Sequence, residues 1–250
     1  MPGTRKRPPQ SQATTIRALF LDVDGVINDP TRIADLWRAH VGYVLEREFG
    51  RTAAEWGVAN RVVFPTVWED RHNWRPGPIE CMEDEMLAFL RAMCAHLGLL
   101  IPERSRGLEV MRRAEIHVCR HPDAVVPGTR EVIVELSHTW HVHMATGNPS
   151  WRVEALLEGL GLLDVVRTRC GPDLVDARKL TPHFFERVFR LAGALPTEAA
   201  VVDDNTEPLW IAARLGARTI HVTSACDGPC EATLHIDSIL ELPAALLHLV

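Results

Sequence analysis

The chain has 250 residues, of which 46% are hydrophobic, and its formal net charge is −6 at pH 7. This length and apolar content allow one full core and a second, smaller module. The negative charge gives no electrostatic support for a nucleic-acid partner or an anionic membrane surface. No apolar run reaches the roughly 18 residues that a membrane-spanning helix requires.

The first sixteen residues differ in composition from the rest of the chain. They are basic, rich in proline, serine and threonine, and lack a hydrophobic stretch, so we expect a disordered tail over 1–16 and no secretory signal. Six cysteines are scattered along the chain, at Cys81, Cys94, Cys119, Cys170, Cys226 and Cys230. We interpret them as reduced thiols of a cytoplasmic protein. The spacing of Cys226 and Cys230 also fits a metal clip or a disulfide loop, but a surface turn is the simpler interpretation.

The first predicted strand ends in two acidic residues. The apolar run 18–21 is followed by Asp22, Val23, Asp24 and Gly25, which predicts a buried strand with a sharp turn at its carboxyl end. Open α/β sheets bind their ligands at that edge. Two carboxylates so close together repel each other unless they share a cation or a proton, and this favours a metal-assisted reaction.

A helical insertion is predicted over residues 28–125. Its first helix has Thr31 as the expected cap and Gly50 as the stop, with apolar residues at helical spacing between them. Further helices are expected over 83–97 and from 102 to about 118. Few strand signals occur in this segment, so we expect a small helical bundle.

The core is predicted to comprise residues 17–27 and 126–250. Strands and helices alternate through the second part, with strands expected at 141–145, 165–168, 200–202 and 219–222, and helices at 151–160, 182–191, 206–215 and 239–248. This alternation is typical of an α/β fold, a Rossmann-like parallel sheet with helices on both faces.

Three further segments place reactive groups after predicted strands or at helix starts. Thr146 and Gly147 follow the strand 141–145, and Asp203 and Asp204 follow the run 200–202. Lys179 is the only lysine outside the N-terminal tail and lies just before Thr181-Pro182, a predicted helix start. A compact ammonium group suits a point contact with a phosphoryl oxygen.

The ordered series DVDGV, TGN, K-x-x-P and VVDDN resembles the haloacid dehalogenase-like (HAD) superfamily, in particular its phosphatase-like members. The resemblance extends from about Arg17 to the C-terminus. A helical cap inserted directly after the first motif is typical of one branch of that superfamily. The resemblance implies a Mg²⁺-dependent phosphohydrolase that acts on a small phosphorylated metabolite through an aspartyl-phosphate intermediate.

The resemblance assigns a role to each motif. Asp22 would be the nucleophile, and Asp24 would protonate the leaving oxygen and later deprotonate water. Asp22, Asp204 and the Asp24 carbonyl match the family's Mg²⁺ ligands. Asp203 would contact the metal directly, act through water, or only cap the following helix.

The phosphoryl group would be held by the Thr146 hydroxyl, the Gly147 amide and Lys179. Substrate recognition is expected in the insertion. The polar, basic stretch from Trp68 to Trp74, which contains Arg71, is the candidate substrate loop. Tryptophans in a small helical module are most often core residues, and an aromatic wall over the active site is the alternative.

Several alternatives stay open at this level. A phosphosugar mutase-like phosphotransferase shares the core motifs, and a catalytically idle HAD-like binding protein is the alternative outside enzymes. A phosphonate hydrolase would need a cap lysine, which is missing, and a dehalogenase does not need Asp24. His141 and His143 share one strand face and predict either a partly buried pair or, less simply, a zinc site. The sequence does not define the oligomeric state.

Overall fold

The computed structural model describes residues 15–70, 78–223 and 231–249, and gives the side chains within these ranges except those of 68–70 and 78–81. Its centre is a six-stranded, fully parallel sheet in the order β3-β2-β1-β4-β5-β6. The strands are β1 (Ala18–Leu21), β2 (His141–Ala145), β3 (Arg169–Cys170), β4 (Ala199–Asp203), β5 (Arg218–Val222) and β6 (Leu234–Ile236). The predicted α/β, Rossmann-like parallel sheet is confirmed.

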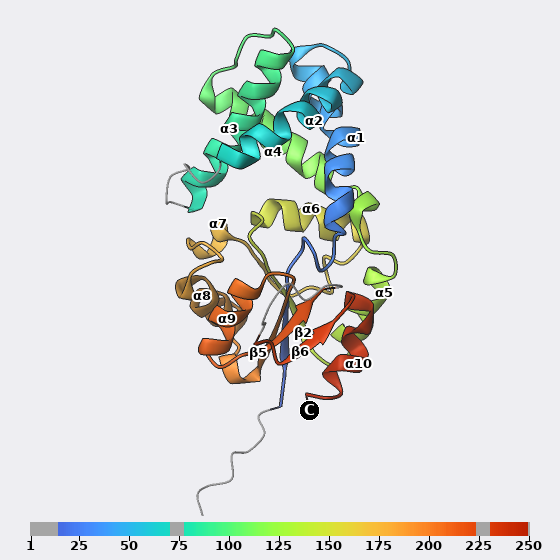
Figure 1. Ribbon diagram of the computed structural model, residues 1–250, viewed down its shortest axis with the longest axis vertical. Coiled ribbons are helices and arrows are strands. Elements are labelled where there is room, and N and C mark those ends of the chain that lie inside the picture. The colour runs from blue at the N-terminus through green and yellow to red at the C-terminus, as the bar shows by residue number, and fades with distance from the viewer. Residues whose placement is uncertain (1–14, 71–77, 224–230, 250) are drawn as a thin grey trace, which may run out of the picture.

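Helices cover both faces of the sheet (Figure 1). They are α5 (Thr129–Ser137), α6 (Ser150–Leu160), α7 (Pro172–Val175), α8 (Pro182–Ala192), α9 (Thr206–Arg214) and α10 (Leu242–Leu246). Short 3-10 turns precede β4 at Pro196–Glu198 and α10 at Ile239–Glu241. Alternate residues of β1 face opposite sides, as the period of a strand requires. Leu19 and Leu21 pack with α5, α6 and α10, whereas Phe20 packs with α8 and α9.

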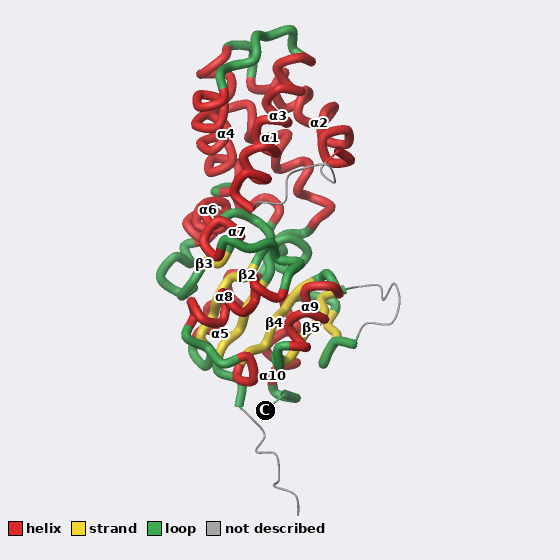
Figure 2. The backbone as a smooth tube through the Cα atoms, turned by 90° about the vertical axis from the view of Figure 1, so that its left-hand side faces the viewer, coloured by secondary structure: helices red, strands yellow, loops and turns green. Residues whose placement is uncertain are grey.

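A helical module extends beyond the carboxyl ends of the strands (Figures 1 and 2). It consists of α1 (Pro30–Phe49), α2 (Ala53–Asp70), α3 (Pro78–His96) and α4 (Arg104–Cys119). A 3-10 turn at Pro122–Ala124 leads the chain back to the core. The module has its own hydrophobic cluster, which includes Trp56, Leu90, Met93 and Val110. The chain therefore leaves the core directly after the loop that follows β1.

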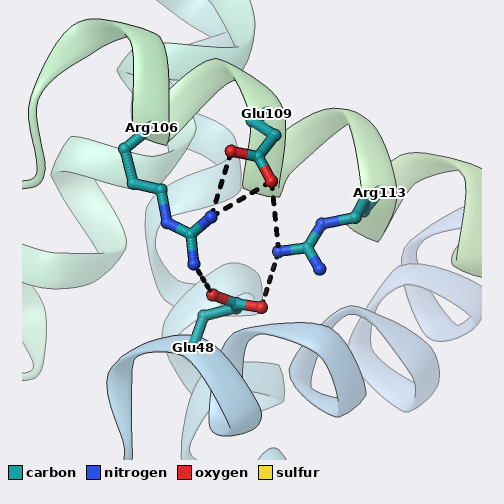
Figure 3. A network of polar contacts seen from close by, with 4 residues as sticks. All are labelled: Glu48, Arg106, Glu109 and Arg113. Carbon is teal, nitrogen blue, oxygen red and sulfur yellow. Dashed lines mark hydrogen bonds and ion pairs between the residues drawn. The ribbon is translucent and has the colours of Figure 1, made fainter.

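Charged side chains connect α1 to α4 on the outside of this module (Figure 3). The Glu48 carboxylate accepts hydrogen bonds from Arg106 and, at 2.6 Å, from Arg113. The hydrogen bond from Arg113 lowers the pKa of Glu48. Glu109 pairs with both arginines along α4. The network joins the end of α1 to the middle of α4, on a surface where single ion pairs stabilise little.

The structure differs from the predictions in several local features. Asp29, not Thr31, caps α1, because the Asp29 carboxylate accepts the Thr31 amide at 2.9 Å. The α2 helix was not predicted, and it contains an internal proline, Pro65. The Thr181 hydroxyl makes no capping bond and instead donates to the Arg178 carbonyl.

Strand limits also shift. β3 lies at Arg169–Cys170, just after the predicted segment 165–168, and β6 was not predicted. Gly50 ends α1 as expected. No helix in the described ranges is long and apolar enough to cross a membrane.

Candidate active site and metal centre

The acidic residues of the first and last motifs meet at the carboxyl edge of the sheet. Leu21 of β1 pairs with Val202 of β4, so Asp22 and Asp203 follow side by side on adjacent strands. The Asp22 amide donates to the Val202 carbonyl at 2.9 Å, which extends the ladder by one residue. Both aspartates are buried, and Asp203 is fully inaccessible. Strand register alone thus brings together two residues that lie far apart in the sequence.

Lys179 lies between these two carboxylates. Its Nζ is 2.6 Å from Asp22 Oδ2 and 2.7 Å from Asp203 Oδ2. Burial alone would lower the pKa of Lys179, but attraction to Asp22 and Asp203 outweighs it, and the pKa is raised. The ammonium group is therefore held charged next to the candidate nucleophile.

One lysine does not neutralise the acidic cluster. Carboxylate oxygens of Asp22, Asp203 and Asp204 all lie within 4.8 Å of one another. Burial, together with the Asp22 charge, raises the pKa of Asp203 to about 7, and the same causes raise the pKa of Asp204. Asp22 Oδ1 is buried without a hydrogen-bond partner. An all-oxygen donor set with surplus negative charge fits Mg²⁺, which prefers oxygen ligands.

Gly25 permits this arrangement. Its φ is +82°, and a Cβ built on it would lie 2.1 Å from Asp204 Oδ2. Any side chain at position 25 would therefore both strain the backbone and displace the Asp204 carboxylate. The Asp204 carbonyl is in turn hydrogen-bonded at 2.9 Å to the His221 ring on β5. A glycine at position 25 thus allows the loop after β1 to approach Asp204 closely.

Two amide side chains hold Asp24. Asn148 donates to Asp24 Oδ2 at 2.8 Å, and Asn28 donates to Asp24 Oδ1 at 3.1 Å. Neither asparagine was predicted as a site residue, although Asn148 is the last letter of the TGN motif and Asn28 follows DVDGV closely. Their side chains orient the carboxylate that could serve as acid and base.

The TGN segment, Thr146 to Asn148, follows β2 and adds a hydroxyl and a backbone amide to the site. The Thr146 hydroxyl is buried and accepts a hydrogen bond from the backbone N–H of Asn148 at 3.2 Å. Gly147 lies beside Lys179, since a Cβ at position 147 would be 3.9 Å from the lysine Cδ. The structure therefore brings Asp22, Asp24, Thr146, Gly147, Lys179, Asp203 and Asp204 to one place, where all seven line the same cavity.

That cavity has a volume of about 620 Å³ and extends from the carboxylates to the helical module. Its wall includes Trp37 of α1, Asn60 of α2, Phe89 of α3 and Met111 of α4. All four helices of the module therefore contribute to the wall. A ligand bound at the sheet edge would extend toward these side chains.

A buried ion pair joins the module to the core at this cavity. Glu115 of α4 is 1% exposed and accepts hydrogen bonds from Arg152 and, at 2.9 Å, from Trp151 Nε1, both on α6. Burial alone would lower the pKa of Arg152, but attraction to Glu115 outweighs it and raises the pKa. No local sequence signal pairs these residues, so sequence reasoning missed them.

The histidines on β2 form no metal-ligand cluster with other described residues. His143 stacks on Phe20 at 4.9 Å and its Nδ1 is 2.8 Å from the Thr168 hydroxyl, while His141 is partly exposed. Another set was missed: His40, His117 and His121 have ring nitrogens within 4.8 Å of one another. His117 and His121 are four residues apart, which is the one sequence signal that places them on a common helical face.

Some predictions fall outside the described part of the chain. Trp68 belongs to the last turn of α2, but its side chain and all of Arg71 lie outside the described residues. The same holds for Cys226 and Cys230. Cys94, Cys119 and Cys170 are free thiols, as expected for reduced cysteines. The roles of Trp68 and Arg71 in substrate recognition stay predictions.

Comparison with known families gives one extensive match. A family model for haloacid dehalogenase-like hydrolases matches residues 16–216. This range includes every candidate site residue on the sheet edge. No curated protein matches the chain.

Solved structures resemble this one over almost their whole length. YfnB from Bacillus subtilis, assigned to the HAD hydrolases and bound to magnesium, is 15% identical, with a TM-score of 0.66 over 93% of this chain and 99% of its own. The 2-haloacid dehalogenase from Pseudomonas syringae is 17% identical, with a TM-score of 0.63 over 94% and 100%. The L-2-haloacid dehalogenase from Xanthobacter autotrophicus is 15% identical, with a TM-score of 0.62 over 94% and 100%. At such low identity these likenesses establish the fold only.

Proposed function

Because the chain belongs to the haloacid dehalogenase-like hydrolase family, we propose that it is a Mg²⁺-dependent phosphohydrolase acting on a small phosphorylated metabolite. The family contains hydrolases of different bonds, and the neighbours named as dehalogenases share only the fold. The choice between a phosphate ester and a carbon–halogen bond therefore depends on the side chains of this chain.

The observation that carries the proposal is the position of Asp24. Its carboxylate is held by two amides near Asp22 and lines the same cavity. A halide leaves as a stable anion and needs no proton, whereas an alkoxide leaving from phosphorus needs a general acid. A second, oriented carboxylate is useful for ester hydrolysis and superfluous for dehalogenation.

The reaction follows from what each side chain can do. An Asp22 oxygen attacks phosphorus while the bond to the leaving oxygen breaks, and Asp24 donates a proton to that oxygen. The products are an aspartyl-phosphate at Asp22 and a free alcohol. Asp24 then removes a proton from water, and the water oxygen attacks phosphorus. This step releases inorganic phosphate and restores the Asp22 carboxylate.

The surrounding groups offset the charge of the phosphoryl oxygens. Lys179, the Thr146 hydroxyl and the Gly147 amide would bind them, with Lys179 already placed 2.6 Å from the nucleophile. Asp22, Asp204 and the Asp24 carbonyl would hold Mg²⁺, with Asp203 beside them. When bound, the ion neutralises the carboxylates and polarises the phosphoryl group. Asp203 would act mainly by fixing Lys179.

We further propose that the helical module is a cap that selects the leaving group, with Trp68 and Arg71 among its substrate contacts. The support for a cap is the cavity itself, which runs from the catalytic carboxylates to all four module helices. Contacts far from the phosphorus discriminate among alcohols, since the phosphoryl group is common to all substrates.

A paired assay tests the proposed reaction. The purified protein would be incubated with a panel of phosphomonoesters and, separately, with 2-chloropropionate, and released phosphate and chloride would be measured with Mg²⁺ or with EDTA. We expect Mg²⁺-dependent phosphate release and no chloride release. Chloride release that is insensitive to EDTA would instead identify a dehalogenase. Release of neither product by a folded protein would support the binding-protein alternative.

A further inference from the structure

The cavity wall facing away from the carboxylates is largely apolar and aromatic. Side chains on this wall include Trp37, Phe64, Met82, Phe89, Met111 and Leu156. A volume of about 620 Å³ exceeds what a phosphoryl group needs. The remaining space is suited to an apolar leaving group, whose burial on these side chains would contribute binding energy.

The charges on this side of the cavity do not favour an anionic leaving group. Away from the carboxylate cluster and Lys179, the described charged residues of the wall are Arg152, Glu85 and Glu115. Arg152 is already bound to Glu115 in a buried pair. Acidic groups therefore outnumber cations on this wall. A carboxylate or second phosphate on the leaving group would find no cation among these residues that is not already paired.

One polar side chain on the wall is unused. Asn60 on α2 lines the cavity and is 4% exposed, and its side chain makes no hydrogen bond to another described residue. A buried amide without a partner is costly unless a ligand or water satisfies it. Asn60 is thus placed to hydrogen-bond a polar atom carried by an otherwise apolar ligand.

We propose that the natural substrate is the monophosphate of a mainly apolar or aromatic alcohol that bears no acidic group and carries a hydrogen-bonding group for Asn60. This inference rests on the proposed phosphohydrolase function and specifies its substrate class. The residues that carry it are Trp37, Phe89 and Met111 for the apolar contact and Asn60 for the polar one. The Glu115–Arg152 pair offers no free cation to an anionic leaving group, because its two charges already neutralise each other.

Benzyl phosphates differing in one substituent test the substrate class. The 4-hydroxymethyl ester should have a kcat/KM about tenfold or more above that of the 4-carboxy ester, a difference equivalent to about 1.4 kcal/mol. Asn60→Leu should lower kcat/KM for the 4-hydroxymethyl ester to the level of unsubstituted benzyl phosphate, and leave the latter almost unchanged. Equal or better turnover of the 4-carboxy ester would overturn the inference.

Binding of the alcohols separates this inference from the proposed reaction. Ligand-observed NMR would compare 1,4-benzenedimethanol with 4-(hydroxymethyl)benzoate, neither of which contains phosphorus. Selective binding of the neutral alcohol without hydrolysis of any monoester would contradict the proposed reaction but support the cavity's selectivity. Hydrolysis of monoesters with no preference between the two alcohols would support the proposed reaction and contradict the inferred substrate class.

A second, independent observation is the histidine cluster at the base of the module. His40 of α1, His117 of α4 and His121 just after α4 have ring nitrogens within 4.8 Å of one another. His40 Nε2 also lies 2.6 Å from the Asp123 carboxylate. The cluster joins α1 to the segment that leads from α4 back to the core. Three imidazoles and one carboxylate are ligands typical of Zn²⁺.

We infer that this cluster is a Zn²⁺ site distinct from the Mg²⁺ centre. The rings of His40 and His121 stack at 3.8 Å, and a metal must lie in the plane of each ligating ring. Binding therefore turns these two rings apart, which their partial exposure permits.

Zinc retention tests this site without any assay of activity. The protein would be equilibrated with Zn²⁺ in millimolar Mg²⁺, desalted, and analysed for metal and melting temperature. Wild type should keep one equivalent of Zn²⁺ and melt at a higher temperature than without zinc. His117→Gln should lose both effects, while His138→Gln, an exposed histidine, should keep them. No zinc retained by wild type, or zinc retained by folded His117→Gln, would overturn the inference.

Discussion

Asn148 donates a hydrogen bond of 2.8 Å to Asp24 across 124 positions of sequence. The bond joins the loop after β2 to the loop after β1, and these two strands are neighbours in the sheet. It directs one oxygen of Asp24, while Asn28 directs the other. The candidate acid is therefore oriented by groups that do not themselves exchange protons with it.

This contact predicts a leaving-group-dependent defect. Asn148→Ala should lower kcat by about tenfold to a hundredfold for alkyl phosphates, because Asp24 loses its orientation. The loss should be smaller for p-nitrophenyl phosphate, whose leaving group needs little protonation. Steady-state kinetics on both substrates would measure the difference, with Asp24→Asn as the reference variant. Equal losses on the two substrates would show that Asn148 does not act through proton transfer.

The candidate nucleophile gives the strongest expected effect. Asp22→Asn removes the attacking oxyanion and one negative charge from the metal site, so kcat should fall by at least about a thousandfold. Circular dichroism should show an unchanged fold. A variant that retains more than about a tenth of wild-type kcat would place the nucleophile on another residue.

The two neighbouring aspartates should differ in their effect on metal affinity. Asp204→Asn should raise the Mg²⁺ concentration needed for half-maximal activity by about tenfold or more, because a neutral amide is a weaker ligand for a hard cation. Asp203→Asn should raise this Mg²⁺ concentration less, because the Asp203 carboxylate already pairs with Lys179 at 2.7 Å and accepts the Asn205 backbone N–H at 3.0 Å. Mg²⁺ titrations of the two variants would decide, and the reverse order would make Asp203 the principal ligand.

His143 predicts how stability depends on pH. The side chain is 2% exposed, and burial lowers its pKa to about 4. An unfolded histidine has a pKa of about 6.5, so unfolding takes up a proton between these two values. The stabilisation is fully present above about pH 6.5 and is lost as the pH falls toward 4, by up to about 3 kcal/mol.

Urea unfolding at several pH values would test this. The free energy of unfolding of wild type should fall more steeply between pH 7 and pH 4.5 than that of His143→Leu, which cannot take up the proton. The exposed His138→Leu serves as the matched control and should follow wild type. Parallel curves for wild type and His143→Leu would mean that His143 is protonated in the folded state as easily as in the unfolded one.

The sheet and the acidic edge were predictable because their signals are local. β1, β2 and β4 are apolar runs that end abruptly in polar residues, and parallel pairing then brings the ends of the runs together. The family motifs are short segments at those same ends. This is why Asp22, Thr146 and Asp203 could be assigned to one site before the structure was known.

The cavity was less predictable because its contacts are long-range. Glu115 and Arg152 are brought together only by packing of α4 on α6, and no sequence pattern near either residue predicts the pairing. The α2 helix was missed since Pro65 and weak apolar periodicity argue against a helix there. The short β6 has too few residues for a period to be read.

The Glu115 contacts also have a consequence for ligand exchange. Glu115 belongs to the module, while Trp151 and Arg152 belong to the core, so any movement that separates the two parts breaks both hydrogen bonds together. Such a movement withdraws a carboxylate from its only described partners in one step, which favours two discrete positions over a continuous range. Entry of a ligand to the cavity and its release then become a gated event, with a rate set by a contact outside the acidic cluster.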